Sequence, residues 1–229
     1  MIYFCFLMLV FHETDVGGDR PSAIGPVRSF AVYTANDLAA LRAAYGRNKT
    51  IPAAYELPAL LALAHYPQLA DAQIDFVVAD VRTPIASRPA IGSLFGRRRN
   101  RVYRIVISES SHWAGSPVLV RNMSLDAQVG ALGHELGHTV FYMRKSFCGL
   151  LGVGFRFLSR KYRIRFERDT DVRAIDHGLG WQLLAWSSEI RGGRHADNPM
   201  SWLDRYYLSP EKIEEYMATR DDYGPSGGR

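Results

Sequence analysis

The sequence predicts an α+β fold, in which a small sheet of two to three strands precedes a mostly helical C-terminal half. Apolar residues recur at helical spacing before residue 66 and again after residue 124. Between residues 74 and 122 they alternate with polar residues or form β-branched runs. The 229 residues, of which 47% are hydrophobic, suit one globular domain with its own core, and we assign residues 19–229 to it.

Residues 1–18 are expected to be an apolar leader and linker that precedes the domain. Residues 2–11 form an unbroken apolar run, which is too short to span a bilayer as a helix. The run resembles the apolar part of an export signal, although a positively charged start and a small-residue cleavage site are missing. We therefore expect a truncated signal peptide and an exported protein, periplasmic or secreted, rather than a cytoplasmic one. A buried first strand is the alternative.

Two helices and then the strands are predicted in the first half of the domain. Residues 34–45 begin with N-cap residue types, and residues 52–65 are rich in leucine at helical spacing. Strands are predicted at 74–81, a β-branched run, and at 101–108, where apolar and polar side chains alternate. A third, short strand is predicted at residues 116–122. The proline-containing stretch between the first two strands is expected to interrupt the sheet.

The next segment, residues 124–143, predicts a long helix with two different faces. Ser124 is a good N-cap residue, and Asp126 places a negative charge in the first turn. An apolar stripe at helical spacing predicts one buried face: Leu125, Val129, Leu132, Leu136, Val140 and Met143. The opposite face carries His134 and His138, four residues apart. Three glycines each weaken the helix by about 1 kcal/mol relative to alanine, so we expect another backbone or a substrate to approach closely there.

The spacing His134-Glu135-x-x-His138 predicts a metal site on this helix. Two imidazoles one turn apart can converge on one ion, and neutral imidazole is a favoured ligand of zinc. Glu135 lies on the rim of the same face, where it can accept a proton from a water molecule that zinc activates. Two surface histidines on an amphipathic helix are the alternative interpretation.

A third ligand is expected downstream, because catalytic zinc takes three protein ligands. Phe141 and Arg144 stand where the metzincin subclass requires glycine and histidine, so that subclass is excluded. Glu167 and Asp171 lie four residues apart on a predicted helix. Glu167 can supply the third ligand, and Asp171 can accept the remaining ring N–H of a ligand histidine and so fix its tautomer.

With these residues the chain resembles the gluzincin branch of the zincin metallopeptidases over roughly residues 70–190, and it is similar to uncharacterised bacterial HExxH proteins. The resemblance implies a zincin-like fold with an active-site helix followed by a glutamate helix. It implies that Zn²⁺ is bound by His134, His138 and Glu167, with Glu135 as general base. The implied function is a zinc-dependent hydrolase, a metallopeptidase that cleaves peptide or protein substrates.

Gluzincins usually supply a further histidine or tyrosine that stabilises the transition state. Three residues are candidates here: His177, His195 and Tyr142. If the helix that carries Glu167 continues to residue 177, the side chain of His177 does not lie on the same face as Glu167. Together with Gly178 it fits a helix C-terminus, where an imidazolium would suit the helix dipole.

The apolar run 147–158 has two interpretations. Basic residues flank it, so residues 147–165 could form an interfacial helix in peripheral contact with anionic lipid. The run is short and lacks a strong polar face, which favours a buried hairpin or helix that closes over the active-site helix. Cys148, within the run, is expected to be a buried thiol.

The charge pattern does not predict a nucleic-acid partner. The net charge is +5, and the densest basic cluster, residues 96–101, contains no interleaved aromatic residues and is expected to be a solvated loop. Two other functions stay open, namely a zinc-binding protein without peptidase activity and a basic module that binds a membrane surface. The sequence predicts neither the substrate nor the oligomeric state.

Overall fold

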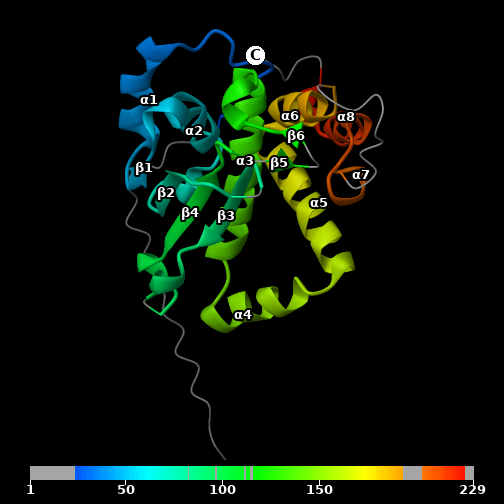
Figure 1. Cartoon of the computed structure of the whole chain (residues 1–229). Coiled ribbons are helices and arrows are strands. Elements are labelled where there is room, and N and C mark those ends of the chain that lie inside the picture. Colours follow the sequence, from blue (N-terminus) through cyan, green and yellow to red (C-terminus); the bar gives the residue numbers. More distant parts are fainter. Residues whose placement is uncertain are drawn as a thin grey trace, which may run out of the picture.

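The computed structural model describes residues 24–224, apart from residues 82, 96, 111, 114–115 and 193–202. A four-stranded sheet lies beside a set of helices, so the predicted α+β class is confirmed (Figure 1). The long helix α3, Leu125–Met143, runs through the middle, between the sheet and the C-terminal helices. The predicted leader, residues 1–18, lies outside the described residues, and so does His195.

The sheet is mixed and has the strand order β1-β2-β4-β3. Its strands are Lys49–Thr50 (β1), Gln73–Val78 (β2), Ile85–Pro89 (β3) and Val102–Ile107 (β4). β2 is parallel to both β1 and β4, with Ile74 opposite Tyr103, whereas β3 is antiparallel to β4. This topology leaves β3 at the edge of the sheet.

The number of strands in the sheet was underestimated from the sequence. Residues 82–89 were expected to interrupt the sheet, but Ile85–Pro89 pairs with residues 103–107 of β4. Its proline stands at the end of an edge strand, where a missing N–H is tolerated. The expected third strand at 116–122 is wrong, because Ser116–Pro117 (β6) pairs only with His112–Trp113 (β5) in a separate hairpin, and Val120–Asn122 is a 3₁₀ turn.

One face of the sheet forms the main core together with α2, Glu56–Leu63, and α3. Along β4, Tyr103, Ile105 and Ile107 are almost completely buried, as the predicted alternation requires. The alternation ends after Ile105, because Val106 and Ser108 are buried as well. Arg104 points to the other face, where it lies 3.9 Å from Asp75. The apolar face of the sheet therefore supports one side of α3.

The helices at the start of the domain confirm the prediction for residues 34–65. A 3₁₀ turn, Ala35–Asp37, leads into α1, Leu38–Tyr45. Thr34 and Asp37 form a capping box, in which each side chain accepts a backbone N–H of the other end of the turn. A second 3₁₀ turn leads into α2, whose apolar residues are buried on all sides.

Close packing explains the glycines of α3. A Cβ atom on Gly130 would lie 2.1 Å from the backbone oxygen of Gln182, in helix α6, Gly180–Gly192. A Cβ on Gly133 would lie 2.4 Å from a methyl group of Leu179, and Gly137 faces Thr170 of helix α5, Arg160–Asp176. The expectation that another backbone approaches closely is confirmed at Gly130.

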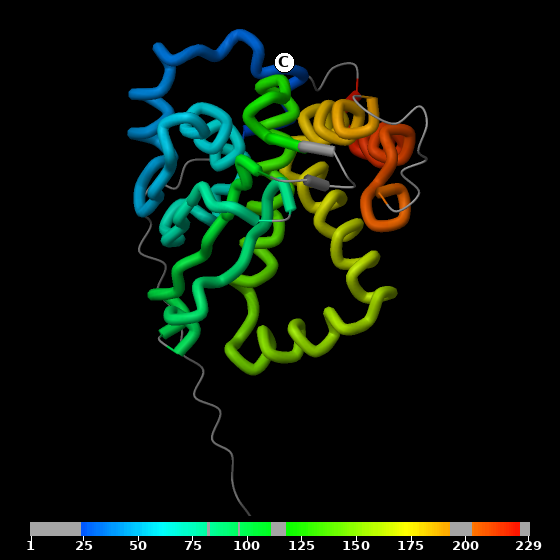
Figure 2. Tube along the Cα trace, viewed as in Figure 1, coloured from blue at the N-terminus to red at the C-terminus, as the bar shows by residue number. Residues whose placement is uncertain are grey.

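Helix α4, Phe147–Arg156, crosses from the end of α3 to the start of α5, and the three helices form a triangle (Figure 2). Val153 is the one buried residue of α4, and Cys148 is exposed. The expectations that residues 147–158 form a buried element and that Cys148 is a buried thiol are therefore wrong. No helix in the described part of the chain is long and apolar enough to cross a membrane.

The C-terminal part consists of α6, α7, Leu203–Tyr206, and α8, Pro210–Ala218. A second apolar cluster lies among these helices and α5: Ala174, Ile175, Leu183, Leu208, Ile213 and Met217. Helix α8 begins directly after Ser209, with Pro210 in its first turn, where the missing N–H of proline is tolerated. This part holds α5 against α3, which is the contact that builds the candidate site.

Candidate metal centre

Three side-chain acceptors converge between α3 and α5. His134 Nε2 lies 3.1 Å from His138 Nε2, and each of these nitrogens lies 3.2 Å from Glu167 Oε2. The helical spacing of four residues places one imidazole a turn above the other, and α5 brings Glu167 to both rings. The two histidines are buried and Glu167 is mostly buried, so little water reaches these atoms. Among the described residues this group could hold a metal ion.

The outer nitrogen of His134 is held by Asp171. Nδ1–H donates to Asp171 Oδ1 over 2.8 Å, and the backbone N–H of Leu208 donates to the other carboxylate oxygen, also over 2.8 Å. The carboxylate is therefore fixed by two donors. A proton on Nδ1 leaves Nε2 of His134 with its lone pair directed at the centre of the group.

The outer nitrogen of His138 is held by Thr170, a residue that sequence reasoning missed. The Thr170 hydroxyl donates to Phe166 O over 2.9 Å, and its oxygen lies 3.2 Å from His138 Nδ1. Because the single hydroxyl proton is already used, Nδ1 must be the donor in this contact. His138 therefore also presents an unprotonated Nε2. The signal for Thr170 was its place on the helix, three residues after Glu167.

The three converging atoms fit a metal ion better than a hydrogen-bond network. When both rings are neutral, none of the three atoms carries a proton, so none can donate to another. In the absence of an ion, a second proton on His134 would instead donate from Nε2 to Glu167, and a metal ion would take the place of that proton. Atoms 3.1–3.2 Å apart share a point about 1.8 Å from each, and a slight displacement from their plane gives the ~2.0–2.2 Å of zinc–nitrogen and zinc–oxygen bonds. Two imidazoles and one carboxylate are also a ligand set that zinc accepts.

The charges around the group favour a cation as well. Three carboxylates, those of Glu135, Glu167 and Asp171, surround the two imidazoles in a buried region. Burial alone would lower the pKa of His134, but its hydrogen bonds to Asp171 and Glu167 hold that pKa well above its ordinary value. Burial alone would raise the pKa of Glu167, but the neighbouring His138 and His134 hold it below its ordinary value. Buried charges are costly unless they are compensated, and a dication would compensate most of this negative charge.

Glu135 lies beside the group, with one carboxylate oxygen available for chemistry. The residue is 6% exposed, and among the described residues no group bonds to its Oε2 atom. The backbone N–H of Ser87, on β3, donates to the carboxylate, while burial raises the pKa of Glu135. A cavity of about 40 Å³, large enough for water, is lined by Glu135, His134, Ile85, Trp186 and Tyr207.

Tyr207, directly after α7, is a second residue that sequence reasoning missed. Its ring lies 5.7 Å from the ring of His134, and it lines the same cavity as Glu135. Burial raises the pKa of Tyr207, and the charges of Glu167, Glu135 and Asp171 raise it further. The hydroxyl therefore stays protonated and can donate. It escaped notice because only the packing of α7 against α5 brings it to the histidines.

The three residues nominated from the sequence as stabilisers have different positions. Tyr142 lies one turn after His138, with the two rings stacked at 6.3 Å, but it does not line the cavity of Glu135. His177 ends α5 as predicted, yet both of its ring nitrogens are engaged elsewhere, by Arg173 O and by Gln68. Burial lowers its pKa, contrary to the expected imidazolium. His195 lies outside the described residues.

Comparison with protein-family models found no match, and neither did comparisons with curated proteins or with solved structures.

Proposed function

We propose that this protein is a zinc-dependent hydrolase of the zincin type, most specifically a metallopeptidase. The observation that carries the proposal is the convergence of His134 Nε2, His138 Nε2 and Glu167 Oε2 on one point, next to an unpartnered oxygen of Glu135. The arrangement of α3 as the helix of both histidines and α5 as the helix of the glutamate agrees with the gluzincin resemblance.

Each of the side chains has a role in peptide hydrolysis. A zinc ion held by the two histidines and Glu167 would supply Lewis acidity toward a water molecule and a carbonyl oxygen. Glu135 takes a proton from the attacking water and later delivers it to the leaving amine. Its raised pKa suits a group that must both accept and return a proton. The Tyr207 hydroxyl donates to the oxygen on which negative charge develops.

The edge strand β3 suggests how a peptide would bind. β3 has no neighbour on its outer side within the sheet, and its Ser87 N–H reaches the Glu135 carboxylate. An extended peptide that adds to this edge would pass beside Glu135 and the cavity. A peptide or protein substrate is therefore the class that the site supports best.

Zinc stoichiometry and cleavage test the proposal in separate steps. The wild-type protein should bind one zinc ion tightly, and Glu167→Ala should bind it at least about tenfold more weakly. Glu135→Gln should retain zinc and lose cleavage in a peptide-library assay, because the amide cannot accept the proton of water. Full activity in Glu135→Gln would contradict the role given to Glu135, and equal zinc affinity in Glu167→Ala would contradict the ligand set.

A zinc-binding protein without peptidase activity is the second candidate. It is favoured by the small size of the cavity beside Glu135, about 40 Å³, which admits water but not a peptide without rearrangement. Stoichiometric zinc, together with no cleavage of any library peptide, would support this candidate over the hydrolase.

A further inference from the structure

The outer side of α4 carries a stripe of apolar side chains, of which Phe147 is half-buried and the others are exposed. Phe147, Leu151 and Phe155 follow one another every four residues, and Leu158 continues the stripe in the turn after the helix. Leu151 is 50% exposed, Phe155 75% and Leu158 83%. The inner side of α4, by contrast, contributes Val153 to a cavity of about 680 Å³ between α3, α4 and α5.

A neighbouring loop extends this stripe. Phe95 is 80% exposed and its ring lies 5.7 Å from that of Phe147, while Ile91 is 74% exposed. Eight large hydrophobic residues are exposed among the described residues, and five of them belong to α4, the turn after it and this loop. We call these five, together with Phe147, the α4 patch. Isolated exposed apolar residues are ordinary, but a gathering of this kind marks a binding surface.

The chain segments that form the α4 patch are strongly basic. Residues 81–108 and 136–166 each contain seven lysines and arginines and no acidic residue. The other residues of the chain then contain 14 basic and 23 acidic side chains, so they are acidic as a whole. The net charge of +5 is therefore unevenly distributed: these two segments are basic, and the rest of the chain is acidic.

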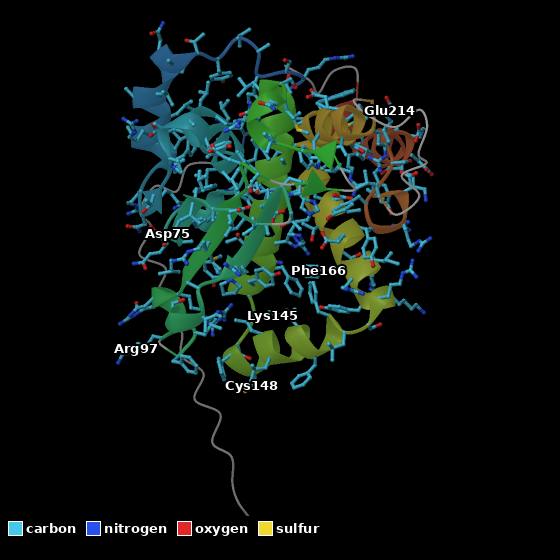
Figure 3. The ribbon with its side chains drawn as sticks, in the orientation of Figure 1. Asp75, Arg97, Lys145, Cys148, Phe166 and Glu214 are labelled. Carbon is cyan, nitrogen blue, oxygen red and sulfur yellow. The ribbon has the colours of Figure 1, made fainter. Side chains whose placement is uncertain are left out.

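The basic residues lie around the patch. Arg97 and Lys145 are found at the end of the molecule formed by α4 and the loop before β4, whereas Glu214 lies at the opposite end (Figure 3). Arg97, Arg98 and Arg99 are exposed on the loop side of the patch, and Arg156, Arg160 and Lys161 are exposed at the other end of α4. An apolar centre is thus bordered by cations on both sides.

We propose that the α4 patch docks on an anionic lipid bilayer. Phenylalanine and leucine side chains would enter the boundary between headgroups and acyl chains, and the surrounding arginines and lysines would lie near lipid phosphates. A nucleic acid would match the charges but not the apolar centre, whose burial needs an apolar medium. The proposal is independent of the hydrolase function, because none of the patch residues belongs to the metal centre.

Vesicle sedimentation of the full chain tests the proposal. The wild type should sediment with phosphatidylcholine vesicles that contain phosphatidylglycerol, more weakly with phosphatidylcholine alone, and less as salt is raised. The double variant Phe155→Glu/Leu158→Glu should bind at least about tenfold more weakly, because two inserted side chains become charged. Val32→Glu is the matched control, since Val32 is 82% exposed but lies outside the patch.

The role of the basic residues around the patch is tested by the double variant Arg160→Gln/Lys161→Gln. Its control is Lys212→Gln, because Lys212 is an exposed lysine of α8. The first pair should weaken binding several-fold and reduce its salt dependence, whereas Lys212→Gln should not change it. The proposal is overturned if the Phe155/Leu158 double variant binds vesicles as the wild type does, since another segment would then anchor the chain. It is also overturned if the wild type ignores anionic vesicles or binds DNA in preference to them. Glu135→Gln should bind vesicles normally, which separates this test from that of the hydrolase.

Discussion

Replacing Asp171 by asparagine should disturb the metal centre through the tautomer of His134. Both oxygens of Asp171 accept N–H groups at 2.8 Å, one from His134 Nδ1 and one from the backbone of Leu208. Asparagine keeps the shape but offers one acceptor and one NH₂ group, so only one of the two donors keeps its bond. If the amide oxygen stays with Leu208, His134 must carry its proton on Nε2, which points at His138 and Glu167.

The expected loss of zinc affinity is large because the proton then occupies the metal position. Loss of such an outer partner typically weakens metal binding 10- to 100-fold, and we expect the upper end, about 2.8 kcal/mol. Competition with a chromophoric zinc chelator measures this directly. If the amide oxygen instead stays with His134, the Leu208 N–H faces the NH₂ group and loses its acceptor, and urea unfolding of the metal-free protein should show a loss of about 1–3 kcal/mol from this unpaired buried donor.

Asp169→Asn is the control for this experiment. Asp169 is on the same helix but is exposed, and it forms a surface ion pair with Arg165 at 3.5 Å. Such surface pairs contribute little to stability, so zinc affinity and unfolding should both stay close to those of the wild type. A zinc affinity for Asp171→Asn within about twofold of the wild type would refute the argument from the tautomer.

Three further predictions follow from the packing and the cavity. Gly130→Ala should destabilise the protein by about 1–3 kcal/mol in urea unfolding, because the new Cβ meets the Gln182 backbone, whereas Gly152→Ala, in open space on α4, should stabilise it slightly. Tyr207→Phe should lower kcat about 100-fold and leave zinc affinity unchanged, and an unaltered kcat would remove Tyr207 from the mechanism. Burial lowers the pKa of His65 from 6.5 to about 4. Between these pH values the unfolded chain binds more protons than the folded protein, so the free energy of unfolding should fall by about 3 kcal/mol as the pH drops through this window. His65→Gln should lack this dependence in a series of unfolding curves.

The parts of the fold that depend on local pattern could be predicted from the sequence. The helices at 34–45, 52–65 and 124–143 follow from caps and from apolar residues at helical spacing, which neighbouring residues determine. The same locality places His134 and His138 on one face. Glu167 needed an additional rule, namely that a catalytic zinc takes three protein ligands.

The missed features depend on contacts between distant segments. The residues of β3 do not have a strand-like pattern, and the strand ends at a proline. It forms a strand because each of its five residues pairs with a residue of β4. α4 is apolar enough to be buried, but α3 and α5 diverge, and no element of the described part of the chain covers the outer side of α4 (Figure 2). Thr170 and Tyr207 reach the histidines only through the packing of α5 and α7. Apart from the position of Thr170 three residues after Glu167 on the same helix, these placements have no signature within a short window of sequence.

The turn of α5 from Phe166 to Asp171 explains why the centre can form before an ion arrives. Within this turn Glu167 faces both Nε2 atoms, Thr170 and Asp171 hold the two Nδ1 atoms, and Phe166 stacks on His138 at 4.7 Å. Contacts that need no metal hold this segment of α5 in place. Thr170 packs against Gly137, and the Asp171 carboxylate accepts the backbone N–H of Leu208. The rings are thus already oriented, and binding does not have to order them. Pre-organisation of this kind lowers the cost of binding an ion at this group.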